Sequence, residues 1–173
     1  MAIREGLLAE FDHEMGATRR LLACVPESKL GWTPHPRSRT IGALGAHITA
    51  ITSWTTHILG APHYDIHEGM PDVPEPTSAA TLLERFQLAV AQARRELDRS
   101  EAELAACWSL RQGGQELFTL PRAAAFRTFV LGHVVHHRGQ LSVYLRLNDI
   151  AVPAIYGPSA DSRRGSSPES EGR

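Results

Sequence analysis

Two histidines four residues apart, His133 and His137, are the residues of this chain best placed to do chemistry together. They lie in the stretch from Phe126 to Leu147, whose apolar residues recur at the spacing of a helix. Side chains four positions apart share one face of a helix, with Cα atoms roughly 6 Å apart, so two imidazoles can reach one metal ion. The pair alone is equally consistent with two core histidines satisfied by hydrogen bonds.

A third histidine at a predicted core position, His47, favours the metal site. The pattern over residues 40–59 predicts a helix capped by Thr40, and His47 falls on its apolar stripe. Burial without a partner costs about 1–3 kcal/mol, so His47 must be hydrogen-bonded, ligated or open to a cavity. Three neutral imidazoles suit Zn, Ni, Fe or Mn, and they leave a coordination position free, as catalytic sites do.

Several other chemistries lack their motifs. A zinc-peptidase helix needs a glutamate where this sequence has Val134 or His136, and no phosphate loop or nucleophile elbow is present. No general base is therefore assigned. Gln140 is a candidate to orient a ligand, although helix packing explains it equally well, and Tyr144 is a weaker candidate better interpreted as a core residue. The histidines and acidic residues of the loop over residues 60–77 lack regular spacing and are interpreted as solvated.

Composition restricts the function classes. The chain has 173 residues, a formal net charge of -1 and 42% hydrophobic residues, which is ordinary for one globular domain. No basic run interleaved with aromatic residues indicates nucleic-acid binding. Cys24 and Cys107 form neither a disulfide framework nor a metal knuckle. The first residues lack the apolar run of a signal peptide and no segment is apolar enough to span a membrane, so we expect a cytoplasmic protein.

The pattern predicts an all-α chain built as a four-helix bundle over residues 1–161. Helices are expected over residues 2–24, 40–59, 78–105 and, last, from Phe126 to Leu147. Two short alternating runs around Gly113 and Gly114 predict a small hairpin before the last helix. Residues 149–161 are expected to run back along the bundle, and the composition of residues 162–173 predicts a disordered tail.

Three stretches resemble a known family, the DinB/YfiT-like superfamily of metalloenzymes. They are HVVHHRGQLSVYLR in the last helix, IYGPSAD after it, and PESKLGWTPHPRSRTIGALGAHI around the second helix. The resemblance covers roughly residues 3–161. It implies an up-down-down-up four-helix bundle, a dimer, and a metal ion held by His47, His133 and His137. It also implies thiol chemistry, because the better-understood branches are mycothiol-dependent maleylpyruvate isomerase and bacillithiol transferases.

The function expected from these observations is a metal-dependent enzyme that activates a low-molecular-weight thiol for S-transfer to a small electrophile. Two alternatives stay open: a metal-dependent hydrolase that uses metal-bound hydroxide, and a non-catalytic stress-response protein that binds metal. The expected cofactor is one divalent ion, with a thiol as cosubstrate. A homodimer with a small-molecule substrate, and no nucleic-acid or membrane partner, is expected. Because ligand histidines must be neutral, metal should be lost below about pH 6.

Overall fold

The computed structural model describes residues 2–69 and 73–162, so all but one residue of the predicted tail lies outside the described residues. Its helices are α1 (Ile3–Leu22), α2 (Ile41–Ser53), α3 (Thr55–Gly60), α4 (Ala79–Glu96), α5 (Glu101–Ala105), α6 (Arg122–Phe126) and α7 (His133–Arg146). A π-helical segment, η3 (Arg127–Gly132), joins α6 to α7, and two short 3-10 turns are η1 (Glu27–Lys29) and η2 (Ile66–Glu68). Its strands are β1 (His63–Asp65), β2 (Cys107–Gln112) and β3 (Gln115–Pro121).

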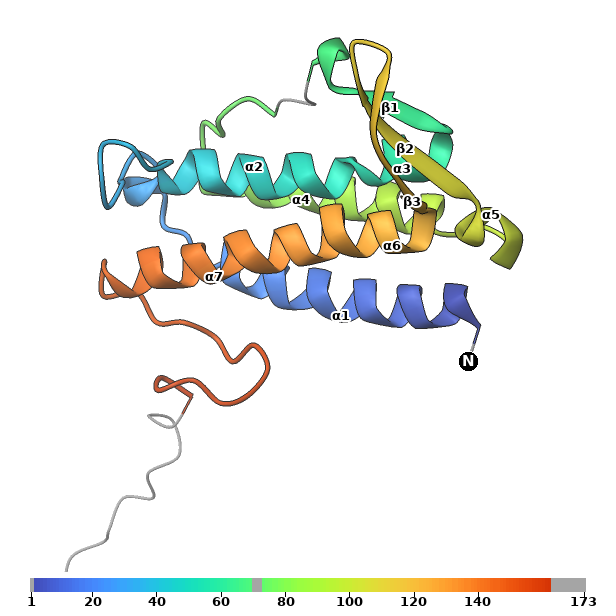
Figure 1. Ribbon diagram of the computed structural model, residues 1–173. Coiled ribbons are helices and arrows are strands. Elements are labelled where there is room, and N and C mark those ends of the chain that lie inside the picture. The colour runs from blue at the N-terminus through green and yellow to red at the C-terminus, as the bar shows by residue number, and fades with distance from the viewer. Residues whose placement is uncertain (1, 70–72, 163–173) are drawn as a thin grey trace, which may run out of the picture.

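The long helices lie side by side, and the strands sit at one end of them (Figure 1). Helices α1 and α7 run in one direction in this view, whereas α2 and α4 run in the other. Helix α2 packs against both α4 and α7, and α1 packs against the same two helices. The predicted helical character is confirmed, since the fold is mostly helical, and a small three-stranded sheet adds to the hairpin that was expected.

Apolar side chains at helical spacing bury one face of each long helix. On α1 the stripe includes Leu7, Phe11 and Met15, and each of these is almost fully buried. Helix α2 begins as predicted, with the Thr40 side chain accepting the Ala43 N–H at 3.0 Å. Its buried face includes Ile48, which lies in the same core as the α1 stripe. The core therefore lies between these helices and is the frame that positions the residues of the site.

Two predicted helices are interrupted. The helix expected over residues 40–59 loses its regular hydrogen bonding at Trp54, which separates α2 from α3. The helix expected over residues 78–105 ends at Glu96, and α5 restarts at Glu101. Ser100 explains the restart, because its side chain accepts the Glu103 N–H while the Glu103 carboxylate accepts the Ser100 N–H. Local capping thus overrides the apolar periodicity that suggested one continuous helix.

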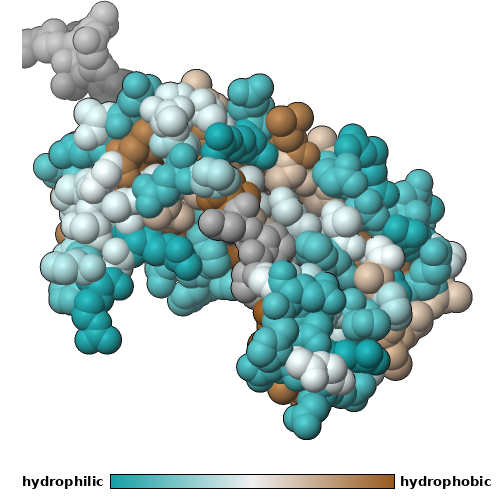
Figure 2. All heavy atoms as spheres, turned by 90° about the horizontal axis from the view of Figure 1, so that it is seen from above, coloured by the Kyte–Doolittle hydropathy of each residue, from teal (hydrophilic) through white to brown (hydrophobic). Residues whose placement is uncertain are grey.

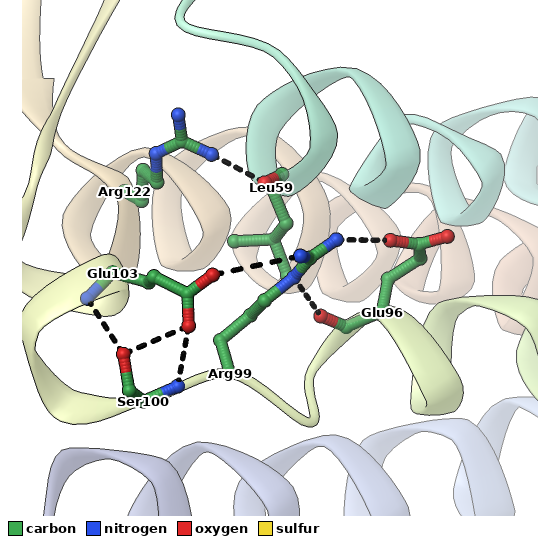
Figure 3. A network of polar contacts seen from close by, with 6 residues as sticks. All are labelled: Leu59, Glu96, Arg99, Ser100, Glu103 and Arg122. Carbon is green, nitrogen blue, oxygen red and sulfur yellow. Dashed lines mark hydrogen bonds and ion pairs between the residues drawn. The ribbon is translucent and has the colours of Figure 1, made fainter.

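An ion-pair network holds this junction (Figure 3). The Arg99 guanidinium lies between Glu96, at 2.8 Å, and Glu103, at 3.6 Å. Close by, Arg122 donates to the backbone carbonyl of Leu59, near the C-terminal end of α3. These contacts join the end of α4 to α5 and tie the start of α6 to α3.

The predicted hairpin is confirmed, and a third strand extends it. Strands β2 and β3 pair antiparallel around Gly113 and Gly114, whose φ angles of 58° and 79° suit a tight two-residue turn. The Asp65 carboxylate accepts both glycine N–H groups, at 3.0 and 2.6 Å, and these bonds lower the pKa of Asp65. Strand β1 pairs parallel with β2. Three residues of mixed polarity give no strand signal, which is why the sequence suggested a loop there.

Helices α2 and α4 approach closely at Gly45, where a Cβ would lie 2.7 Å from a Leu82 methyl carbon. We expect Gly45→Ala to lower the free energy of unfolding by about 1–3 kcal/mol, because the added methyl overpacks a rigid contact. Gly139→Ala is the matched control, because that α7 glycine has open space at its Cβ position. It should be neutral or gain up to about 1 kcal/mol from helix propensity. Urea denaturation of both variants measures the difference, and equal effects would contradict the packing argument.

The segment after α7 reaches back to a buried ion pair between α7 and α1. Arg138 is 3% exposed and its Nη2 lies 2.7 Å from a carboxylate oxygen of Glu14, which is 12% exposed. Arg138 Nη1 also donates to the Glu14 carbonyl at 3.0 Å and to the Thr18 hydroxyl at 3.3 Å. The Tyr156 hydroxyl donates to the same Glu14 carboxylate at 2.9 Å. The segment therefore runs back along the helices, as predicted.

Hydrophilic side chains cover most of the face seen from above, and hydrophobic ones form separate patches (Figure 2). None of the helices in the described part of the chain combines the length and the apolar character needed to cross a bilayer.

Candidate metal centre

Three imidazole rings from two helices meet inside the fold. The Nε2 atoms of His133 and His137 are 3.0 Å apart. The ring centroid of His47 lies 5.4 Å from that of His133 and 4.6 Å from that of His137. One nitrogen from each ring lies within 4.8 Å of the others, and all three residues are half-buried. The structure therefore brings together the three residues that the sequence singled out, and their ligation of a metal stays a prediction.

Packing and a change of helix type place these rings. Helix α2 carries His47 in its middle and packs against α7, which carries His133 and His137 one turn apart. The π-helical segment η3 ends immediately before His133. Such wide turns carry one extra residue and recur at functional sites. Here the extra residue determines the direction in which the side chains of His133 and His137 point from the helix.

Hydrogen bonds on the outer nitrogens determine which atoms face inward. The Gln140 side-chain oxygen lies 2.7 Å from Nδ1 of His137, so Nδ1 carries the proton and Nε2 holds a free electron pair. The ring of His133 is hydrogen-bonded to the backbone of Phe129. Because Nε2 of His133 faces His137, the nitrogen that donates to Phe129 is Nδ1. The two Nε2 atoms lie 3.0 Å apart, and with both Nδ1 atoms protonated each would offer an electron pair to a cation between them.

The spacing of His133 and His137 fits a divalent transition-metal ion, and the third nitrogen, from His47, lies within 4.8 Å of them. Imidazole nitrogens bind zinc at about 2.0–2.1 Å, which places two ligand nitrogens about 3.0–3.4 Å apart at ordinary bond angles. The separation between His133 and His137 meets this requirement.

Tyr144 packs edge-on against Trp32, with ring centroids 5.7 Å apart, which matches its interpretation as a core residue.

Burial keeps the three rings neutral. It lowers the pKa of His47 to about 4, with the positive charge of Arg39 and the other two rings adding to the effect. The pKa values of His133 and His137 are also lowered, chiefly by burial. Hydrogen bonds to Phe129 and Gln140 oppose this lowering in part. All three imidazoles are therefore in the neutral form that binds metal at pH 7.

A cavity of about 790 Å³ opens beside the rings of His47 and His133. Its walls come from α2, from η2, from residues 73–75 before α4, from β2 and from η3. Most of the lining is apolar, including Ile51, Trp54, Ile66, Leu110 and Phe129. A small molecule in this cavity would lie against the inner side of the histidine group, as expected of a substrate beside a metal centre.

A mostly helical chain with three convergent histidines beside a cavity is the architecture of a candidate metal-binding protein. The chain belongs to the DinB superfamily, whose family model matches residues 10–141. An uncharacterized protein of Bacillus subtilis, YrdA, is 27% identical over 158 residues, which cover 89% of this chain and 88% of YrdA.

Two solved structures share the fold. A DinB-like protein from Bacillus cereus has a TM-score of 0.71 at 23% identity, with 88% of this chain and 97% of that chain covered. The DinB-like protein YjoA from Bacillus subtilis has a TM-score of 0.70 at 15% identity, with 89% and 99% covered. At these identities the likeness concerns the fold alone.

Gln140 is expected to support metal binding through His137. Gln140→Leu removes the oxygen that accepts the hydrogen bond from Nδ1 of His137. Loss of a residue that orients a metal ligand typically lowers metal affinity about 10–100-fold. Gln140→Glu keeps an acceptor at the same place and should lose much less. Zinc titration with a competing chelator measures both affinities. Equal affinity in the wild-type protein and the leucine variant would show that packing alone orients His137.

The lowered pKa values shift the expected pH of metal release. Protons compete for an imidazole only near or below its pKa, so the pKa of about 4 for His47 predicts retention well below the pH 6 that an unperturbed histidine suggests. We expect metal content to stay nearly flat from pH 7 to about pH 5.5 and to fall towards pH 4. Elemental analysis after dialysis across this range is the measurement. Loss centred near pH 6.5 would show that burial does not act on the site as described.

Two features of the site carried no usable sequence signal. Arg39 lies in a loop rich in proline and serine and resembles any solvated arginine. Phe129 lies on the helix that was predicted correctly, but the π-helical segment changes which side chains face the cavity. The loop residues His63, Asp65, His67 and Glu68 do not join the histidine group among the described residues, and Asp65 fixes the hairpin turn instead.

Proposed function

We propose that the protein is a metal-dependent enzyme that transfers a low-molecular-weight thiol to a small electrophile. The observation that supports this most directly is the group of three neutral imidazoles beside a mainly apolar cavity. A divalent ion held by His47, His133 and His137 would favour the thiolate form of a thiol at neutral pH. Thiolates are the reactive nucleophiles of such transfers, and the apolar lining suits an electrophile with a hydrophobic body.

The residues of this chain have separate tasks in the proposal. Gln140 keeps Nδ1 of His137 protonated, so the other ring nitrogen is free for the metal. Trp54 and Phe129 hold the electrophile and reduce its contact with water. The sulfur forms a bond to the electrophilic carbon while the leaving group departs with the electrons of its own bond, and the thiol proton passes to solvent. No carboxylate is required as a base, which agrees with the all-histidine group.

The proposal extends to assembly and location. We infer an up-down-down-up four-helix bundle as the helical framework and a homodimer as the working form, located in the cytoplasm. The substrate is a small molecule, and neither nucleic acid nor membrane is a partner. Light scattering of the purified protein tests the dimer independently of activity.

The decisive experiment is a thiol-transfer assay with chlorodinitrobenzene as electrophile. Cysteine, glutathione, bacillithiol and mycothiol are supplied in turn to the protein, first stripped of metal and then reloaded with Zn, Ni, Fe or Mn. We expect formation of the thioether and chloride to rise at least about tenfold over the metal-free protein with one thiol. Identical rates with and without metal for every thiol would contradict the proposal.

Two variants make the assay specific. His133→Ala removes one expected ligand, whereas His35→Ala removes an exposed loop histidine whose ring accepts the Arg37 N–H. Only the first should lose the metal-dependent rate. Turnover of an ester substrate without any thiol would favour a metal-dependent hydrolase instead. Tight metal binding without turnover of either kind would favour a non-catalytic metal-binding protein.

A further inference from the structure

We propose that the cavity takes a ligand with an apolar body and a carboxylate, and that Arg39 binds the carboxylate. Arg39 lines the cavity beside His47, just before the start of α2. It is exposed at the cavity mouth, while the apolar side chains line the walls. The molecule expected here is therefore amphipathic, with its charge at the mouth and its hydrophobic part inside. The inference rests on the proposed function only in identifying this ligand as the electrophile.

Within residues 2–69 and 73–162, the Arg39 side chain is left open to such a ligand. No described residue gives its guanidinium a hydrogen bond or an ion pair. Glu75 is the acidic residue of the lining, and its carboxylate accepts a long hydrogen bond of 3.5 Å from the Thr40 hydroxyl. An arginine fork offers paired donors in the geometry that a carboxylate accepts. The Glu75 carboxylate, which reaches the residue next to Arg39, would disfavour an anion, so a preference for a carboxylate requires the Arg39 guanidinium to outweigh it.

The helix terminus does not supply the anion site in its place. The first N–H groups of α2 are already used: Ile41 donates to the Trp32 carbonyl at 2.9 Å and Gly42 donates to the Leu30 carbonyl at 2.8 Å. The third, from Ala43, is bound by the Thr40 side chain. An anion at this end of the cavity therefore finds its donors on the Arg39 side chain rather than on the backbone.

The charge of Arg39 also reaches the metal centre. It contributes to lowering the pKa of His47, His133 and His137, so its field acts at the histidine group. A ligand that spans from Arg39 to the histidines thus has one guanidinium donor at its outer end, with the Glu75 carboxylate nearby. The apolar surface between them, from residues such as Ala43 and Ala46, accommodates the body of the molecule. Hydrophilic thiols such as cysteine have little apolar surface to place there, which favours the electrophile as occupant.

The test measures binding to metal-free protein, so it does not depend on catalysis. Phenylbutyrate and its uncharged amide are titrated by calorimetry into the wild-type protein, Arg39→Gln and Arg37→Gln. Arg37 is the matched control, because it lies in the same exposed loop and does not line the cavity. We expect the acid to bind about tenfold more tightly than the amide, and this preference to vanish only in Arg39→Gln.

Two results would overturn the proposal. One is equal affinity of acid and amide for the wild-type protein, and the other is an unchanged preference in Arg39→Gln. Displacement of phenylbutyrate by an equal concentration of cysteine would overturn the identification of the ligand as the electrophile. Because thiol and metal are absent from the titration, its failure is distinct from failure of the transfer assay. Circular dichroism of each variant checks that the substitution leaves the helices intact.

Discussion

Replacing His137 by alanine is expected to lower the affinity for divalent metal by more than about 100-fold. Residues that merely orient a ligand are typically worth about 10–100-fold, so loss of a ligand itself costs more. His137 is also the ring closest to both others, with centroid distances of 4.6 and 4.7 Å. The variant should therefore retain little metal after purification. Elemental analysis of the variant beside the wild-type protein measures this directly.

Thermal unfolding gives a second measure of the same change. Metal present at about 100 times its dissociation constant stabilises a protein by about 2.7 kcal/mol, which raises Tm by about 5–10 °C in a chain of this size. We expect this rise in the wild-type protein and in His35→Ala, and its absence in His137→Ala. An equal rise in all three would show that the metal binds elsewhere.

Arg138→Met is expected to lower the free energy of unfolding by about 3–5 kcal/mol. The substitution leaves the Glu14 carboxylate buried without its cation, and an uncompensated buried charge has a cost of this size. Glu14 and Arg138 are 12% and 3% exposed, so water screens their interaction little. The corresponding fall in Tm is about 6–20 °C.

Arg127→Met is the matched control for this prediction. Arg127 also pairs with an α1 carboxylate, Glu10, at 2.9 Å, but the two side chains are 49% and 42% exposed. An exposed pair of this kind contributes about 0–1 kcal/mol. Similar falls in Tm for both variants would contradict the role assigned to burial. Adding Glu14→Gln to Arg138→Met should restore part of the loss, because it removes the unpaired charge.

The sequence predicted the parts of this fold that depend on periodicity. Helical spacing identifies the long helices and places His47, His133 and His137 on inward faces. Adjacent glycines between alternating runs located the hairpin. These features depend on local spacing and turn chemistry, which are properties of the chain itself.

Other features depend on contacts between distant segments and were missed. Strand β1 exists because it pairs with β2 and because Asp65 binds the hairpin turn, and neither contact is visible locally. The breaks at Trp54 and Ser100 interrupt apolar patterns that continue through them. The placement of Arg39 at the cavity depends on how its loop packs over α2, so the sequence showed only a solvated cation.

The wide turn between Arg127 and Gly132 has a consequence for how this helix can evolve. One additional residue rotates the following part of an α-helix by about 100°, so the wide turn changes which side chains face inward before and after it. Before the turn, packing in the core fixes which side of the helix carries Phe126. After the turn, the ion that they would share fixes the side that carries His133 and His137. Substitutions in one half of the helix can thus accumulate without changing which side chains of the other half face inward. Single-residue insertions and deletions among relatives should therefore cluster at this junction.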